Sequence, residues 1–179
     1  MRIVAGEFRG RQLKSPTWEG LRPTSDRLRE TLFNILGPSV RGARVLDAYA
    51  GTGAIGIEAL SRGAAEVTFV ERDPRAVKLI EANLSALGAS GAIIRAGWSD
   101  AVTRLGGQVF DLIILDPPYA DTAAAEALEA AHALVSEGTR VVVEHAARHA
   151  PPADVSGLRL MRTVKAGDSA LSFYEPLLL

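Results

Sequence analysis

Cysteine is absent from this sequence of 179 residues, and its absence excludes several kinds of chemistry. Without thiols the chain can form no disulfide, no thiolate zinc site and no iron–sulfur cluster, and no cysteine can attack a substrate. The sequence also lacks any apolar run of about 20 residues, and no apolar stretch near residue 1 would suit a signal peptide. We therefore expect a soluble cytoplasmic protein without a membrane segment.

A large net charge is lacking too, because the formal value is −1, but the charges are unevenly spread along the chain. Residues 1–44 carry nine Lys/Arg against four Asp/Glu, whereas the remainder is acidic. Such a basic segment is a candidate surface for a polyanion, although a short arm with exposed arginines can also be simply solvated. We divide the sequence into a basic extension, residues 1–44, and one main domain, residues 45–179.

After residue 44, short apolar runs alternate with amphipathic stretches, which predicts an α/β fold. Strands are expected at 45–47, 67–70, 92–94, 110–115 and 141–143, with helices over 73–88 and 123–134. The pattern favours a parallel sheet with helices on both faces. Residues 158–179 hold two strand-like runs with no room for a helix between them, which predicts an antiparallel hairpin.

Two smaller elements are expected within the basic extension. Residues 2–16, RIVAGEFRGRQLKSP, alternate around glycines and predict a small β-hairpin. Residues 25–38 predict a helix that begins after a Ser25 cap and ends at Gly37-Pro38.

The segment after the first predicted strand, DAYAGTGAIG, contains a literal G-x-G-x-x-G, with Glu71 about twenty positions further on as in a dinucleotide site. Asp47 argues against a dinucleotide. A carboxylate about 5 Å from a pyrophosphate would cost roughly 3 kcal/mol at an effective dielectric near 20, whereas it would attract an ammonium or sulfonium. The motif therefore favours a cationic ligand such as S-adenosylmethionine, with its ribose hydroxyls on Glu71.

The same segment resembles the first motif of class I methyltransferases, D-x-[FY]-x-G-x-G, and FVERD resembles their second. The resemblance implies a Rossmann-like fold with a mostly parallel seven-stranded sheet that ends in the antiparallel hairpin. It also implies a set of residues that bind S-adenosylmethionine: Asp47, Tyr49, Gly51, Thr52, Gly53, Glu71, Arg72, Ser99 and Asp100. The plainer alternative is that Asp47 is a turn residue, Glu71 a strand-end charge and Tyr49 a packing residue.

The fourth predicted strand ends in Asp116-Pro117-Pro118-Tyr119. Two prolines remove two backbone donors and fix an extended turn, which leaves their carbonyls free to accept. Asp116 adds a carboxylate, and Tyr119 adds an aromatic face on which a flat ring can stack for about 1–3 kcal/mol. An exocyclic amine of a nucleobase fits, with its two N–H groups on the Asp116 side chain and the Pro117 carbonyl. A rigid loop with a packing tyrosine is the alternative.

This turn is similar to the [DNS]-P-P-[YF] motif of amino-group methyltransferases, which implies catalytic roles for Asp116, Pro117, Pro118 and Tyr119. The lack of cysteine argues against methylation at pyrimidine C5, which usually needs a thiol nucleophile. We therefore expect a nitrogen target and catalysis that rests mainly on in-line positioning and electrostatics.

Three further segments resemble the RsmD family of 16S ribosomal RNA guanine N2-methyltransferases: RIVAGEFRGRQLKSP, RPTSDRLRETLFNILG and KAGDSALSFYE. The resemblance covers nearly the whole chain and implies methyl transfer to the N2 amine of a guanine in 16S rRNA or the small-subunit particle, without a metal. A target base must be unpaired or flipped out to react. Phosphate contacts are expected from six residues of the extension: Arg9, Arg11, Lys14, Arg22, Arg27 and Arg29.

Two departures from the family pattern stand out. The segment RAGWSDAV inserts residues after the third predicted strand, so the residue that holds the adenine could be Trp98, Ser99 or Asp100. Ala166 stands where a tyrosine is often found.

Other functions stay open at this point. A DNA adenine or cytosine amino-methyltransferase fits the same core motifs, an NAD-dependent oxidoreductase fits the glycine motif, and a cofactor-free RNA-binding module fits the basic extension. His145 and His149 are four positions apart, but the metalloprotease glutamate is missing between them, so we expect no metal site.

Overall fold

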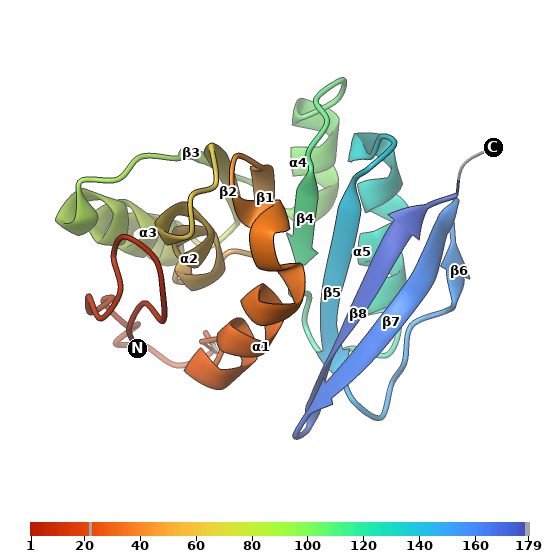
Figure 1. Ribbon diagram of the computed structural model, residues 1–179, viewed down its shortest axis with the longest axis horizontal. Helices are drawn as coiled ribbons and strands as arrows, with labels where there is room; N and C mark the ends of the chain where they lie inside the picture. Colours follow the sequence, from red (N-terminus) through yellow and green to blue (C-terminus); the bar gives the residue numbers. More distant parts are fainter. Residues whose placement is uncertain (22, 178–179) are drawn as a thin grey trace. The chain divides into compact units, whose positions relative to one another are not determined.

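The computed structural model describes residues 1–21 and 23–177, and the chain divides after Gly97 into two units, Met1–Gly97 and Trp98–Leu179 (Figure 1). The division falls inside the main domain expected from the sequence. The predicted boundary between the basic extension and the main domain, at residues 44 and 45, was based on the distribution of charge. It stays a prediction.

The first unit contains a parallel sheet with the strand order β3-β2-β1 (Figure 1). Its strands are β1 (Arg44–Ala48), β2 (Glu66–Glu71) and β3 (Ala92–Arg95). Helix α2 (Ala54–Ser61) joins β1 to β2, and helix α3 (Pro74–Leu87) joins β2 to β3. The apolar residues of β1 and β2 are buried, as the runs of valine, leucine and phenylalanine predict.

Local sequence signals set the ends of α3 as expected. The Asp73 side chain accepts a hydrogen bond from the Arg75 backbone N–H, Pro74 opens the helix, and Gly88 ends it in the left-handed region with φ 65°. Helix α1 (Asp26–Leu36) behaves in the same way, since Ser25 Oγ accepts from Leu28 N at 3.1 Å. A short 3₁₀ helix, η1 (Gly37–Val40), follows it.

The β-hairpin predicted for residues 2–16 is reduced to one antiparallel bridge between Arg2 and Gln12. The reason is a competing acceptor. Glu58 of α2 accepts hydrogen bonds from Val4 N at 2.9 Å and from Ala5 N at 3.0 Å, so these donors do not form a strand ladder. The buried Glu58 carboxylate therefore holds residues 2–16, which we call the arm.

The second unit contains β4 (Leu112–Leu115), β5 (Arg140–Ala146), β6 (Asp154–Val155), β7 (Leu158–Ala166) and β8 (Ser169–Pro176). Their order is β4-β5-β8-β7-β6, with β4 and β5 parallel and the remaining pairs antiparallel (Figure 1). The helices are α4 (Trp98–Arg104), α5 (Ala123–Ala131) and the 3₁₀ helix η2 (His132–Leu134). The C-terminal hairpin predicted over residues 158–179 is confirmed by β7 and β8, while residues 178 and 179 lie outside the described residues.

The α/β class is confirmed, but the expected count of seven strands is wrong. Eight strands occur in the described residues, because the two-residue strand β6 pairs with the start of β7. The short helix α4 was not expected from the sequence. Among the described residues, no helix is long and apolar enough to cross a membrane.

Candidate active site

The loop between β1 and α2 owes its shape to left-handed backbone conformations. Tyr49, Gly51 and Gly53 have φ values of 61°, 56° and 77°. Tyr49 is noteworthy because a bulky residue rarely adopts a positive φ, and such strain gathers at functional sites. A hydrogen bond of 2.8 Å from Gly53 N to Ala50 O closes the turn. We call residues 47–56 the glycine loop.

Two carboxylates hold the backbone of the glycine loop in place. Asp47 Oδ2 accepts from Gly56 N at 2.8 Å. Glu71 accepts from Gly51 N through Oε2 and from Asp73 N through Oε1, both at 2.8 Å. Each oxygen of a carboxylate has more than one acceptor site, so both side chains retain capacity for a ligand N–H or O–H group. The two predicted ligand-binding acids therefore also build the loop.

The electrostatics of the glycine loop favour a cation. Burial raises the pKa of Asp47 to about 8, the hydrogen bond from Gly56 N opposes this rise, and the negative charge of Glu71 adds to it. A positive group next to Asp47 would lower its pKa again, because opposite charge favours the ionised form. The site fits S-adenosylmethionine, whose ammonium and sulfonium are cationic and whose ribose offers hydroxyl donors.

Gly56, the third glycine of the motif, is required by packing. A Cβ atom there would lie 2.3 Å from Phe69 Cε1 and 2.8 Å from Val67 Cγ1, both on β2. The helix can therefore approach the strand closely only because Gly56 has no side chain.

The other predicted cofactor residues fall into two groups. Thr52 is buried, and its carbonyl accepts from the Asn83 side chain at 3.2 Å. Arg72, Ser99 and Asp100 are exposed, the latter two in the first turn of α4. Their contacts with a cofactor stay predictions. Trp98 is buried in the second unit, and its indole N–H donates to Ala127 O at 3.1 Å, which gives it a packing role.

The Asp116–Tyr119 turn follows β4 in the second unit. Pro118 O accepts from Ala120 N at 2.8 Å, whereas no hydrogen bond to the Pro117 carbonyl occurs within residues 1–21 and 23–177. The Tyr119 hydroxyl donates to Glu144 Oε1 at 2.8 Å and lies 2.6 Å from Ser169 Oγ, while 37% of Tyr119 is exposed. The turn thus presents an acceptor and a partly exposed aromatic ring.

A pocket adjoins this turn, with an empty volume of about 350 Å³ that is partly open to solvent. Glu144, His145 and His149 line it together with the two prolines and Tyr119. Sequence reasoning did not select Glu144 or Ser169. One signal was available for each, since Glu144 interrupts an apolar strand and Ser169 belongs to the G-D-S segment.

The two histidines have separate partners. His145 Nε2 lies 2.8 Å from Ser172 Oγ, and His149 Nδ1 lies 3.0 Å from Asp121 Oδ1. No group of three or more His, Asp or Glu side chains that could hold a metal is found in the described part of the chain.

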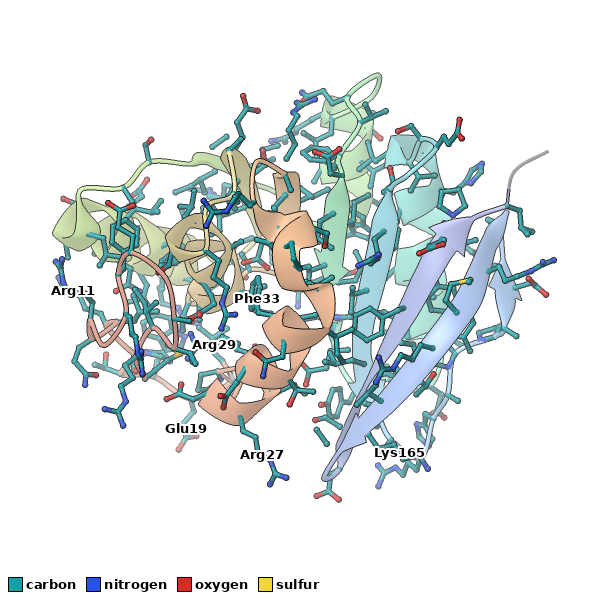
Figure 2. All side chains as sticks on the ribbon, in the orientation of Figure 1. Arg11, Glu19, Arg27, Arg29, Phe33 and Lys165 are labelled. Atoms are coloured by element: carbon teal, nitrogen blue, oxygen red, sulfur yellow. The ribbon has the colours of Figure 1, made fainter. Side chains whose placement is uncertain are left out.

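The basic extension has exposed and buried cations. Arg9, Arg11, Lys14 and Arg27 are exposed, and Figure 2 shows Arg27 pointing away from α1. Arg11 Nη2 donates to Ala86 O at 2.7 Å, which ties this side chain to the end of α3. The sixth predicted contact residue, Arg22, lies outside the described residues.

The prediction that Arg29 contacts RNA phosphates is wrong, because 0% of Arg29 is exposed. Its guanidinium pairs with Asp26, lies 3.7 Å from Glu58 Oε2 and donates to Arg2 O at 2.8 Å. Arg29 is one helical turn from Phe33, on the buried face of α1. It holds the arm to α2 and is not a surface cation.

Asn83 is another buried polar residue that the sequence patterns did not single out. Its Oδ1 accepts from Lys14 N at 2.7 Å, and its Nδ2 donates to the carbonyls of Lys14 and Thr52, both at 3.2 Å. One amide on α3 therefore holds both the arm and the glycine loop.

These observations define the class of protein. A glycine loop held by two strand-end carboxylates in one α/β unit, and an Asp-Pro-Pro-Tyr turn after β4 in the other, belong to the class I methyltransferase fold. The chain belongs to the family described as Conserved hypothetical protein 95, which matches residues 1–175.

The chain is also similar to individual proteins that are named as methyltransferases. Ribosomal RNA small subunit methyltransferase D of Escherichia coli (strain K12) is 45% identical over 121 residues, which are 66% of this chain and 60% of that protein. The protein YlbH of Bacillus subtilis (strain 168) is 34% identical over 184 residues, 98% of each chain. The solved structure of yhhF from Escherichia coli has a TM-score of 0.88 and 32% identity, and covers 100% of this chain and 99% of that one. The resemblance to the RsmD family is confirmed.

Proposed function

We propose that this protein transfers a methyl group from S-adenosylmethionine to the exocyclic N2 amine of a guanine in 16S rRNA of the small ribosomal subunit. The observation that carries the proposal is the Asp116–Tyr119 turn, in which the Pro117 carbonyl accepts no hydrogen bond from the described residues and the tyrosine ring is partly exposed. The curated relative named for small-subunit rRNA methylation supports the substrate class.

In this proposal the first unit binds the cofactor. Asp47 holds the methionyl ammonium, directly or through water, and Glu71 accepts from the ribose hydroxyls. S-Adenosylmethionine supplies an electrophilic methyl group on a sulfonium. Because backbone N–H groups already order Asp47 and Glu71, these side chains move little when a cation arrives, and Asp47 then gives up the proton that burial makes it keep.

The second unit binds the target amine. The Asp116 carboxylate and the Pro117 carbonyl accept the two N–H groups of the amine, which draws its lone pair out of conjugation with the ring. Tyr119 stacks on the base. Because the amine attacks before it loses a proton, no strong general base is needed. Asp116 takes up that proton after transfer or passes it to water.

The exposed cations of the extension, Arg9, Arg11, Lys14 and Arg27, contact rRNA phosphates. Charge reversal tests this role, since Arg27→Glu should weaken rRNA binding and lower the salt dependence by about one phosphate contact. Lys78→Glu is a matched control, because Lys78 is an exposed cation on α3 outside the extension. If the two variants bind rRNA with equal affinity, the role of the extension is wrong.

The central experiment uses small ribosomal subunits from cells that lack this protein. Incubation with the purified protein and methyl-labelled S-adenosylmethionine should place the label on N2 of one guanine, mapped by mass spectrometry of rRNA fragments. Asp116→Ala should abolish transfer while it still binds S-adenosylhomocysteine in a calorimetric titration. Label on duplex DNA instead of rRNA, or heat from NAD but not from S-adenosylhomocysteine, would overturn the proposal.

A further inference from the structure

We propose that Glu144 and Ser169 are positioning residues that fix the ring of Tyr119 in the orientation needed by the target base. The inference rests on the proposed function, because it concerns the same turn. It is carried by the two contacts of the Tyr119 hydroxyl, 2.8 Å to Glu144 Oε1 and 2.6 Å to Ser169 Oγ.

Strand register brings these residues together from three parts of the chain. Leu115 of β4 pairs with Val143 of β5, so the turn after β4 runs past Glu144. Ala146 of β5 pairs with Ser169 of β8, and side chains two positions apart on a strand share a face of the sheet. Glu144 and Ser169 therefore lie on the same face, where both can reach the Tyr119 hydroxyl.

The directions of the two hydrogen bonds follow from the groups involved. A phenol has one proton, and an ionised carboxylate can only accept, so the Tyr119 proton goes to Glu144. The Ser169 hydroxyl must then donate to Tyr119 Oη. With its far end held by one acceptor and one donor, the ring cannot swing about χ1 without breaking both bonds. Rotation about χ2 leaves Oη in place, but a phenol O–H prefers the plane of its ring, so the directions of the two bonds also favour one ring plane.

A second tyrosine of the same unit shows what a packing role looks like. Tyr174 has 0% exposure, donates to the Pro152 carbonyl at 2.8 Å, and has its pKa raised to about 12 by burial. Tyr119 differs in both respects, since it is 37% exposed and its hydroxyl partners are two buried side chains, Glu144 and Ser169. An anchored hydroxyl with an accessible ring suits an aromatic platform that must meet a base at a set angle.

The kinetic test compares Tyr119→Phe, Glu144→Ala and Ser169→Ala with Tyr174→Phe as the matched control. Loss of the Tyr119 hydroxyl or of the Glu144 carboxylate should lower kcat on small subunits about tenfold, which is the scale of one lost hydrogen bond. KM for S-adenosylmethionine should not change. Glu144→Gln keeps an acceptor oxygen and should recover most of the activity. The double variant Tyr119→Phe/Glu144→Ala should be no slower than Tyr119→Phe alone, because loss of the hydroxyl already removes the bond to Glu144.

A measurement that needs no turnover separates this inference from the proposed function. The chain has three tyrosines, so ¹³C labelling at Cζ gives three resonances that Tyr→Phe variants assign. Glu144→Ala and Ser169→Ala should each shift the Tyr119 resonance and leave that of Tyr174 in place. If the resonance of Tyr119 stays unchanged in both variants, the inference is wrong even where the wild type methylates rRNA. If the resonance shifts as expected while the wild type leaves rRNA unmodified, the proposed function fails instead.

Discussion

The glycine loop and the Asp116–Tyr119 turn are both held by carboxylates, but the groups that these carboxylates bind differ. In the loop, the hydrogen bonds that Asp47 and Glu71 accept from the described residues come from backbone N–H groups. At the turn, Glu144 accepts from a side-chain hydroxyl. Backbone donors remain whatever the side chain, so the loop can be disturbed only through its acids or through packing. At the turn, deletion of the Tyr119 hydroxyl oxygen is enough to remove the contact with Glu144.

The largest effect is expected at Asp47, whose titration makes the free energy of unfolding depend on pH. Its pKa is about 3.8 in an unfolded chain and about 8 in the folded protein, because burial penalises the charged form. Between these values the folded state keeps a proton that the unfolded state has lost. Rising pH therefore favours unfolding, by up to about 1.4 kcal/mol per pH unit.

The variant Asp47→Asn removes this titration and should leave the neighbouring charge of Glu71 in place. Its free energy of unfolding relative to wild type should increase from about pH 4 to about pH 8 and then level off. Urea denaturation of both proteins across this range measures the difference. A constant difference over the whole range would show that the Asp47 carboxylate is not buried as the structure has it.

A smaller loss of stability is expected from a change in the packing of the loop. Gly56→Ala places a methyl group 2.3 Å from Phe69 Cε1, and overpacking of this kind typically costs about 1–3 kcal/mol. Gly97→Ala is the matched control, because a Cβ atom there meets nothing within 4 Å. Thermal unfolding should separate the two variants by several degrees. Equal melting temperatures would mean that α2 and β2 can move apart at little cost.

The loop was predictable from the sequence, whereas the support of the turn was not. Asp47, the glycines and Glu71 stand in a short local pattern, and their roles depend on the ends of neighbouring parallel strands. The ends of α3 were equally local, since the Asp73 cap and Gly88 act on adjacent backbone. Such features need no knowledge of long-range register.

Glu144 and Ser169 meet Tyr119 only because of the register of three strands, which no local pattern encodes. The prediction that Arg29 contacts phosphates was wrong for a related reason. Its charge predicted a surface position. Its spacing to Phe33 places it on the buried face of α1, where its guanidinium lies close to the Glu58 carboxylate. The short elements α4 and β6 lack strong caps or long apolar runs, so their sequences gave little signal.

The smallest effect on stability is expected at the turn, from Tyr119→Phe. The ring stays in place and is 37% exposed, and Glu144 lines the adjoining pocket, where water can replace the lost donor, so loss of the hydroxyl should cost about 1 kcal/mol or less, the net value of an ordinary hydrogen bond. Tyr174→Phe should cost more, because the Pro152 carbonyl loses its donor from a fully buried ring. Urea denaturation of both variants, beside Gly56→Ala, orders the three costs. If Tyr119→Phe proves as destabilising as Gly56→Ala, the turn is part of the core, and its tyrosine cannot be varied separately from the fold.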